Sequence, residues 1–396
     1  MNCPKIQFPE FQGTEWKPTR IDSVLRKVTK PVSVDPEQYY VEIGIKSHGR
    51  GIFHKEPVLG RALGNKRVFW VEENALVLNI VFAWEQAIAV TTASQQGLIA
   101  SHRFPMYLPK NDSCITSFLC YVFLTKKGKR LLELASPGGA GRNKTLGQKN
   151  FDELVVHLPS SVEQAKIASF LTAIDQRITQ LNQKCDLLVL YKKGAMQQIF
   201  SQELRFKDDD GQDFPAWENK KAGDIFANVV NRNHNSDLPV LTATQERGMI
   251  FRDESGLDIK ASDESIKSYK IVESGDFVIS LRSFQGGIEY SSVKGICSPA
   301  YTVMKPKLKI VDGFFKAYLK KDDFIRRLNG LMLGIRDGKQ ISYGSFSSLT
   351  LPYPCIKEQL KIAAFLSTLD EKITITKAQL AALLQYRQGL LQQMFA

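Results

Sequence analysis

The stretch EQAKIASFLTAIDQRIT occupies residues 163–179, and EQLKIAAFLSTLDEKIT occupies residues 358–374, an offset of 195 residues. With no gap, residues 163–200 match residues 358–395 at 16 of 38 positions. Such a constant offset indicates a tandem duplication. Upstream the match fades and the offset drifts, so that Trp16 aligns with Trp217. The 396-residue chain is therefore predicted to contain two halves, each made of a divergent head followed by a similar arm.

The apolar residues of each arm recur at alternating intervals of four and three, the heptad pattern of a long helix that packs against another helix. The first arm carries this seam at Ile167, Leu171, Ile174, Ile178, Leu181, Cys185 and Leu188. The second arm carries it at Ile362, Leu366, Leu369, Ile373, Thr376, Leu380 and Leu383. A helix of about 40 residues spans roughly 60 Å and needs a partner along its apolar side. We expect the arms to pair as an antiparallel coiled coil about a pseudo-twofold axis; the alternative is that each arm packs on its own head.

The heads are predicted to be mixed α/β domains. Strand-like runs rich in β-branched and aromatic residues cover 39–45, 75–82, 277–281 and 300–304, and helical stretches cover 117–133 and 314–329. Ser160 and Glu163 predict a capping box at the start of the first arm. The predicted division is 1–158 for the first head, 159–203 for the central helix, 204–353 for the second head and 354–396 for the C-terminal helix.

The formal net charge of +12 favours a polyanionic partner, because basic side chains that neutralise phosphates release condensed counterions. The arms contribute only +3 of this charge, so the basic residues belong mainly to the heads. Many basic proteins bind no polyanion, and charge alone does not decide the matter. The longest apolar runs are too short to cross a membrane, and the six Cys form no CxxC pair. We expect a cytoplasmic protein with reduced thiols and no membrane partner.

The sequence contains none of the motifs that mark common active sites. It has no GxxxxGK[ST] loop, no GxGxxG after a strand, no GxSxG elbow and no His/Glu cluster with metal-ligand spacing. Asp253 and Glu254 are adjacent acids, and the simplest interpretation is a solvated turn. We therefore expect no catalytic residue, no metal site and no cofactor bound by this chain.

The candidate DNA-binding segments are the Gly-rich basic loops that end both heads, at 136–151 and 333–346, and the segment 282–287 after a strand of the second head. Glycine lets the backbone approach a phosphate closely, and Arg, Asn and Gln side chains can read base edges. The candidates are Arg142, Asn143, Lys144 and Lys149 in the first head, and Arg282, Gln285, Arg336, Lys339 and Gln340 in the second. Phe82 and Trp84 are expected to belong to the core, and residues 126–130 (KKGKR) are compatible with the end of a helix, where cations favour the dipole.

The tandem arms EQAKIASFLTAIDQRIT…YKKGAMQQIF and EQLKIAAFLSTLDEKIT…YRQGLLQQMF resemble those of specificity (S) subunits of type I restriction-modification systems. The segments FAWEQAIAV…GLIASHRFPMY and YKIVESGDFVIS also resemble the target-recognition domains of that family. The resemblance covers essentially the whole chain, in the order head, arm, head, arm.

The resemblance implies a non-catalytic subunit that recognises double-stranded DNA. Each head would read one half of an asymmetric bipartite target, and the helices would set the spacer and bind two methylation (M) subunits. Adenine methylation with S-adenosylmethionine, and ATP- and Mg-dependent cleavage, would belong to M subunits and restriction (R) subunits. Two alternatives remain open: the recognition subunit of another methyltransferase assembly, and a coiled-coil scaffold that does not bind DNA.

Overall fold

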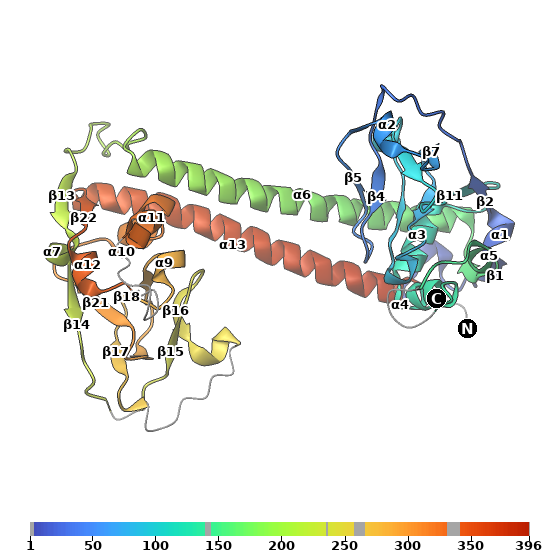
Figure 1. Cartoon of the computed structure of the whole chain (residues 1–396). Helices are drawn as coiled ribbons and strands as arrows, with labels where there is room; N and C mark the ends of the chain where they lie inside the picture. The colour runs from blue at the N-terminus through green and yellow to red at the C-terminus, as the bar shows by residue number, and fades with distance from the viewer. Residues whose placement is uncertain (1–3, 139–143, 235–236, 257–265, 331–340, 396) are drawn as a thin grey trace. The chain divides into compact units, whose positions relative to one another are not determined.

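The computed structural model describes residues 4–138, 144–234, 237–256, 266–330 and 341–395. The chain forms two compact units (Figure 1). Unit 1 consists of residues 1–182 and 378–396, and unit 2 consists of residues 183–377. Each unit therefore contains one head together with a segment of each long helix, and each is described by itself.

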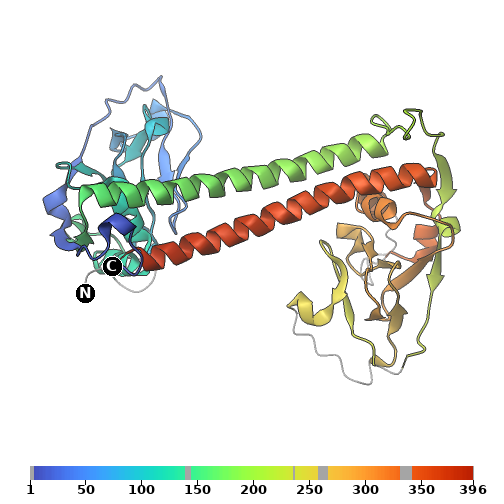
Figure 2. The same ribbon diagram turned by 180° about the vertical axis from the view of Figure 1, so that it is seen from behind.

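The two arms are the helices α6 (Ser161–Phe200) and α13 (Ile356–Gln393). Every residue of the predicted seams is buried or half-buried. In unit 1 the first part of α6 shares a core with the last part of α13, and in unit 2 the last part of α6 shares a core with the first part of α13. The segments run antiparallel in each unit (Figures 1 and 2), so the antiparallel pairing expected from the heptads is confirmed.

One ion pair between the helices occurs in each unit. In unit 1 Arg387 of α13 donates to Asp175 of α6, which also accepts a 2.9 Å hydrogen bond from the Tyr121 hydroxyl. In unit 2 Lys192 of α6 lies 2.5 Å from Asp370 of α13. Asp175 and Asp370 are separated by the repeat offset, as are Lys192 and Arg387. The duplication therefore preserves an ion pair between the helices as well as their apolar seam.

Each long helix begins with a buried glutamine that satisfies backbone groups of its own head. Gln164 donates to the carbonyl of Pro159, and Gln359 donates to the carbonyl of Pro354. Their side-chain oxygens accept from the backbone N–H groups of Ile115 and Val311, respectively. These hydrogen bonds attach the start of each helix to the segment that leads into α3 or α10.

The capping box predicted at the start of α6 is only half present. The backbone N–H of Glu163 donates to the Ser160 hydroxyl over 3.3 Å. The Glu163 side chain does not return to the cap; it accepts from Trp16 and Gln7 instead. Hydrogen bonds from the N-terminal segment therefore engage the Glu163 side chain, which the local sequence predicts to bond the cap.

Unit 1 is built on the antiparallel sheet β2-β11-β8-β9, with separate pairs β1-β12, β10-β7, β4-β5 and β3-β6. Its strands are β1 Lys17–Arg20, β2 Leu25–Val28, β3 Tyr39–Tyr40, β4 Ile43–Ile45, β5 Ile52–His54, β6 Val58–Leu59, β7 Val68–Trp70, β8 Leu76–Leu78, β9 Ile88–Val90, β10 Ile99–Ser101, β11 Met106–Pro109 and β12 Val155–Leu158. Its short helices are α1 Ile21–Val24, α2 Gly60–Leu63, α3 Thr116–Leu124, α4 Lys126–Leu134 and α5 Gln148–Asp152, with 3-10 turns at Pro9–Phe11, Ala83–Glu85 and Ala93–Gln95.

Unit 2 repeats this plan with the sheet β14-β21-β18-β19 and the pairs β13-β22, β17-β20 and β15-β16. Its strands are β13 Glu218–Lys221, β14 Phe226–Val229, β15 Leu241–Thr244, β16 Gly248–Phe251, β17 Lys270–Val272, β18 Phe277–Ile279, β19 Glu289–Tyr290, β20 Gly295–Cys297, β21 Thr302–Pro306 and β22 Thr350–Tyr353. Its short helices are α7 Ala222–Ile225, α9 Ser283–Gly286, α10 Asp312–Tyr318, α11 Asp322–Gly330 and α12 Tyr343–Ser347, with a 3-10 turn at Arg252–Ser255. The mixed α/β class predicted for both heads is confirmed.

The helical stretches predicted at 117–133 and 314–329 are each two helices rather than one. In unit 1 the break lies at Thr125, whose hydroxyl accepts a 2.9 Å hydrogen bond from the backbone N–H of Gly128 and so caps a new helix. A Cβ on Gly128 would lie 2.1 Å from the carbonyl oxygen of Val122, so only glycine permits this close approach. The cations of 126–130 consequently stand at the beginning of α4, and their assignment to the end of a helix is wrong.

Candidate nucleic-acid interface

A groove of about 550 Å³ lies on the head of unit 1. Its lining combines four basic side chains with aromatic and small polar ones and includes no Asp or Glu. The lining residues are Lys55, Lys66, Asn79, Val81, Phe82, Ser101, His102, Arg103 and Phe104. An acid-free groove of this composition suits the phosphates and base edges of a nucleic acid.

Three loop segments that follow strands or helices form the walls of this groove. The turn after β8 is closed by Asn79, whose side-chain oxygen accepts a 3.1 Å hydrogen bond from the N–H of Val81. The backbone N–H of Ile80 donates to the carbonyl of Arg103, which joins this turn to the segment after β10. The N–H of His102 donates to the carbonyl of Arg67, which joins that segment to the one after α2. Strand pairing thus unites residues that lie far apart in sequence.

One buried carboxylate contacts both lysines of the groove. Glu42 is 7% exposed and lies 2.5 Å from the ammonium of Lys66 and 3.3 Å from that of Lys55. The backbone also brings Lys55 close, since its N–H donates to the Glu42 carbonyl over 2.9 Å. One carboxylate shared by two ammonium groups leaves a net positive charge at the groove and restrains both lysine side chains.

The exposed residues of the groove are the two lysines together with Phe82, His102 and Arg103. Phe82 is 38% exposed, so its assignment to the core is wrong. Within the described part of the chain, the Arg103 guanidinium makes no hydrogen bond or ion pair. Its donors are therefore available to a ligand.

The basic loop that ends the first head reaches the same region. Lys144 lies over the Trp84 ring, with 5.6 Å between its nitrogen and the ring centroid. Leu146 donates its backbone N–H to the carbonyl of Ile80, in the turn after β8. Lys149 is exposed on α5. The candidates Arg142 and Asn143 lie outside the described residues.

In unit 2 the corresponding turn after β18 carries Arg282 and Gln285. Arg282 precedes α9 and Gln285 lies within it, and both side chains are exposed. The candidates Arg336, Lys339 and Gln340 lie outside the described residues. The DNA-binding assignments in both heads stay predictions.

A larger cleft of about 850 Å³ lies in unit 2 between the head and the long helices. Its charges are balanced, and nearly all are paired. The pairs are Lys192–Asp370, Lys193–Asp322, Lys320–Glu289, Lys321–Asp323 and Arg326–Asp323. At its base, burial raises the pKa of Glu289 and lowers the pKa of Lys320, while their 2.6 Å contact opposes both shifts. Because most of its cations are paired with carboxylates, this cleft is poorly suited to bind a polyanion.

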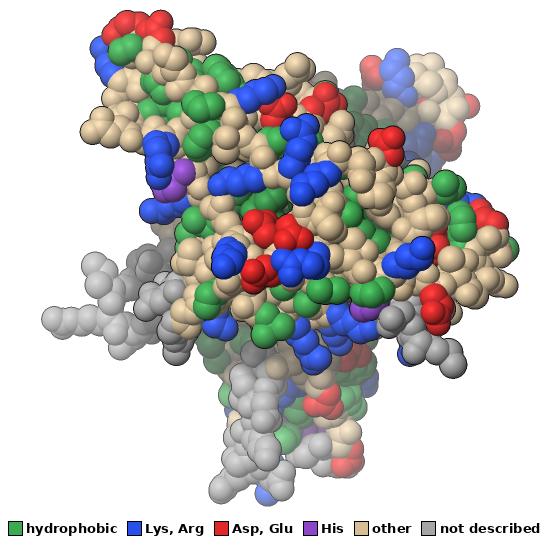
Figure 3. Space-filling model, turned by 90° about the vertical axis from the view of Figure 1, so that its right-hand side faces the viewer, with side chains coloured by type: hydrophobic (Ala, Val, Ile, Leu, Met, Phe, Trp, Pro, Cys, Tyr) green, Lys and Arg blue, Asp and Glu red, His purple; other side chains and the backbone are tan. Residues whose placement is uncertain are grey.

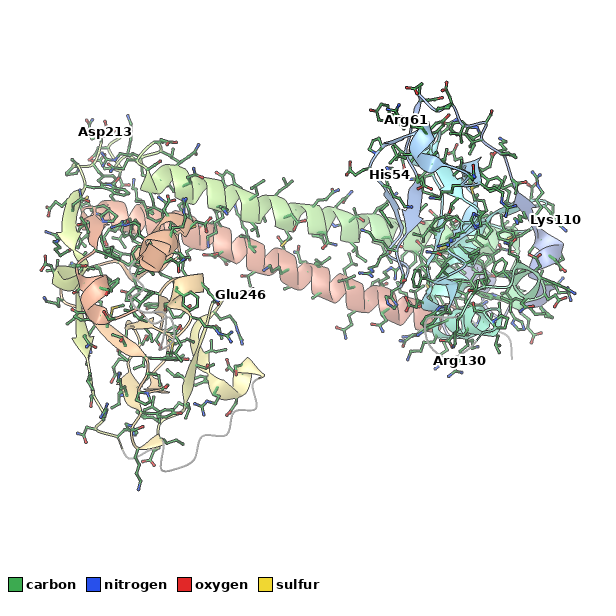
Figure 4. The ribbon with its side chains drawn as sticks, viewed as in Figure 1. His54, Arg61, Lys110, Arg130, Asp213 and Glu246 are labelled. Carbon is green, nitrogen blue, oxygen red and sulfur yellow. The ribbon has the colours of Figure 1, made fainter. Side chains whose placement is uncertain are left out.

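The face of the molecule shown in Figure 3 carries mixed charge. Figure 3 presents a face on which Lys and Arg side chains alternate with Asp and Glu. Figure 4 labels His54, the last residue of β5, which directly precedes Lys55 of the groove.

Sequence reasoning missed Glu42, Lys55, Lys66, Asn79 and Arg103. They lie in separate segments of the chain, and no helical or strand periodicity relates them. The only available signal was the pair His102-Arg103 directly after an apolar run, inside GLIASHRFPMY.

The described residues contain neither a metal-binding cluster nor a helix that could span a membrane. No three His, Cys, Asp or Glu side chains among them gather as a metal ion would require. None of the described helices combines the length and apolar character needed to span a bilayer.

A comparison with protein families matches residues 51–187 and 216–385 to the type I restriction modification DNA specificity domain. The putative type I restriction enzyme MjaX specificity subunit of Methanocaldococcus jannaschii is 22% identical over 307 residues, which cover 74% of this chain and 70% of that protein. The MjaVIII specificity subunit of the same organism is 24% identical over 404 residues, covering 94% and 91% of the two chains.

Two solved structures share the fold. The type I restriction-modification S subunit from M. genitalium has a TM-score of 0.62 at 15% identity, covering 100% of this chain and 99% of that one. A chain from a study of complex assembly and conformational transition of a type I system has a TM-score of 0.52 at 16% identity, covering 96% and 97%. The two matched segments cover most of the sequence, and the chain belongs to the type I restriction-modification DNA specificity family.

Proposed function

We propose that this chain is the DNA-recognition subunit of a type I restriction-modification complex, and that each head reads one half of an asymmetric bipartite target. The observation that carries the proposal is the same fold built twice with different side chains at corresponding places. The turn after the central strand offers Asn79 and Phe82 in unit 1 but Ser280 and Ser283 in unit 2. Two identical heads would favour a symmetric target, whereas these heads favour two different half-sites.

The long helices serve as the spacer and as the binding surface for methylation subunits. Val189 and Tyr191 are exposed on α6 in unit 2, and their repeat equivalents Leu384 and Tyr386 are exposed on α13 in unit 1. Exposed apolar side chains at a conserved helical position favour a protein partner. Because each unit presents one copy, this surface supports two copies of the same methylation subunit.

The chemistry of the complex resides in its other subunits. Adenine methylation with S-adenosylmethionine is proposed for the methylation subunits, and ATP- and Mg-dependent cleavage for the restriction subunits. The chain described here supplies specificity, in the cytoplasm, without a catalytic role of its own.

Sequencing of methylated bases in cells tests this function. DNA from cells that carry the chain with its methylation subunit should contain a split, asymmetric adenine-methylated motif, and the motif should vanish when the chain is deleted. Exchange of residues 1–158 for another first head should alter one half of the motif and leave the other intact. An active methylation subunit with the same motif in the absence of this chain would refute the proposal.

A further inference from the structure

The acid-free groove of unit 1 has two parts with different chemistry. One part is formed by Lys55 and Lys66, whose side chains are 41% and 35% exposed and which both contact the buried Glu42 outside the groove lining. The other part is the exposed Arg103 beside Asn79 and Phe82. The first part offers point charges, and the second offers directional donors next to an apolar ring.

We infer that Lys55 and Lys66 together hold one backbone phosphate of the target, that Glu42 positions them, and that Arg103 reads the neighbouring base pair in the first half-site. The inference rests on the proposed function and assigns residues to it. The partner is double-stranded DNA, and the base that Arg103 selects is guanine.

The lysine pair fits a phosphate because its charge is incompletely neutralised. Two ammonium groups share one carboxylate, so one positive charge remains for an anion. Each ammonium has three donors, and Glu42 uses one from each. Lysine binds phosphate as a point charge and carries no sequence information, so this contact sets the register of the head on DNA.

Arg103 fits a base edge because it is unpaired among the described residues and has donors only. A guanidinium donates in bidentate fashion to O6 and N7 of guanine, which are both acceptors in the major groove. Its main chain is held rigidly, because its carbonyl accepts from Ile80 and the neighbouring His102 N–H donates to Arg67. Phe82, which also lines the groove and is exposed, supplies an apolar surface for the base pair.

Glu42 is a positioning residue rather than a DNA ligand, and the effect of Glu42→Gln on DNA binding distinguishes this role from a simple charge effect. Glu42→Gln removes a negative charge near DNA, so an account based on charge alone predicts tighter binding. Loss of the carboxylate also releases both lysine side chains from one geometry. We expect Glu42→Gln to weaken target binding several-fold, and Glu42→Asp to restore part of it.

The test measures binding of fluorescent duplexes by the full chain in complex with its methylation subunit, over a series of salt concentrations. One duplex contains the target defined by methylated-base sequencing, and the second has its first half-site scrambled. The double variant Lys55→Ala/Lys66→Ala should weaken binding to both duplexes and lower the slope of log K against log salt by about 1, as expected for one phosphate contact. Lys17→Ala, at an exposed lysine of β1 in the same unit, is the matched control and should change neither quantity.

Arg103→Ala should weaken binding to the target by about fivefold to 150-fold, the range for loss of a good bidentate base contact, and barely change binding to the scrambled duplex. The methylated motif should become degenerate at one position of the first half-site and stay intact in the second. Hydrogen exchange of unit 1 should match that of the wild-type chain, which excludes misfolding.

The outcomes distinguish a failure of the proposed function from a failure of the roles assigned to Arg103 and Glu42. Absence of salt-dependent binding to the target by the wild-type complex would refute the proposed function itself. Normal wild-type binding with an unchanged motif and unchanged affinity in Arg103→Ala would refute only the base contact. Equal weakening of both duplexes by Arg103→Ala would assign Arg103 to the phosphates and overturn its role in specificity. Tighter binding by Glu42→Gln would overturn the positioning role.

Discussion

The starts of α6 and α13 differ in how they accommodate the same buried glutamate. Glu163 and Glu358 are repeat equivalents, and both are fully buried. In unit 2, Arg205 donates to both oxygens of Glu358 at 3.0–3.2 Å. In unit 1, Gln7 and Trp16 each donate to one oxygen of Glu163 over 3.3 Å, and the other oxygen has no partner among the described residues.

The surrounding contacts show that Gln7 and Arg205 occupy the same place. The next residue in each case is an aromatic one, and Phe8 packs against Phe170 as Phe206 packs against Phe365. The two halves therefore share the carboxyl group and its burial, while its partner is a cation in unit 2 and an amide with an indole N–H in unit 1. Burial without a cation raises the pKa of the Glu163 carboxyl, although the hydrogen bonds from Trp16 and Gln7 act in the opposite direction. The comparison teaches that repeat-equivalent charged residues can have different partners and therefore different electrostatic surroundings.

The largest effect is expected from removal of the cation in unit 2. Arg205→Gln reproduces the unit 1 arrangement but leaves a buried glutamate whose surroundings are built for an ion pair. We expect a loss of about 3–5 kcal/mol in the free energy of unfolding of unit 2, the usual cost of one partner lost from a buried pair. Hydrogen exchange of residues 356–366 reports this locally.

Arg205→Lys keeps a cation at the same place and serves as the control. It should cost less than Arg205→Gln, because it loses only the two-pronged geometry. A loss below about 1 kcal/mol in Arg205→Gln would show that the pair contributes as little as an exposed one.

The next effect is the pH dependence that Glu163 gives to the stability of unit 1. Burial holds the pKa of Glu163 above its usual value, although the hydrogen bonds from Trp16 and Gln7 act in the opposite direction. Because the folded state holds the proton more tightly than the unfolded state, this contribution is fully present below the ordinary glutamate pKa. It is lost as the pH rises through the raised pKa.

Urea unfolding of unit 1 between pH 4 and pH 8 measures this dependence. Glu163→Gln should remove it, because the amide does not titrate. Gln7→Arg should also reduce it, and should stabilise unit 1 near neutral pH by about 1–2 kcal/mol, since it supplies the missing cation. An identical pH profile in Glu163→Gln and the wild-type chain would assign the dependence to other groups.

The smallest effect concerns the repeated ion pairs between the helices. Asp175 is the less exposed of the two aspartates, with 35% of its side-chain surface exposed against 57% for Asp370, and it also accepts from Tyr121. We expect Asp175→Asn to cost about 1 kcal/mol and Asp370→Asn a few tenths, because solvent screens the more exposed pair. Equal losses in urea unfolding of the two units would show that exposure does not distinguish them.

The heptads predicted the two long helices and a helical partner for each, because helical periodicity is a local property that recurs over 40 residues. The antiparallel direction was the model preferred for a duplicated chain with a pseudo-twofold axis. Short elements were harder to predict. The run 117–133 has continuous helical character, but the Thr125 cap and the close approach of Gly128 to the Val122 carbonyl divide it. Likewise the capping box at Ser160 loses its glutamate to Trp16, a residue 147 positions away.

The candidate interface was likewise predictable from the sequence only in part. The turn after the central strand and the basic loop beside it could be singled out from composition, and Lys144 does approach Trp84 there. The groove itself could not be predicted, because Glu42, Lys55, Lys66 and Arg103 come from four segments. Their union depends on the pairing of β4 with β5 and of β7 with β10, and on the backbone bond from His102 to Arg67.

Sequence by itself determined that this protein is a duplicated chain with two similar helical arms and two different heads, since repeats and heptads are written in the order of residues. Only the tertiary structure decided which charges are neutralised. Gln7 and Arg205 stand opposite equivalent glutamates, and one buried glutamate restrains two lysines at a groove free of acids, because partners of a charge are chosen by distance in space and by burial, which residue order does not state.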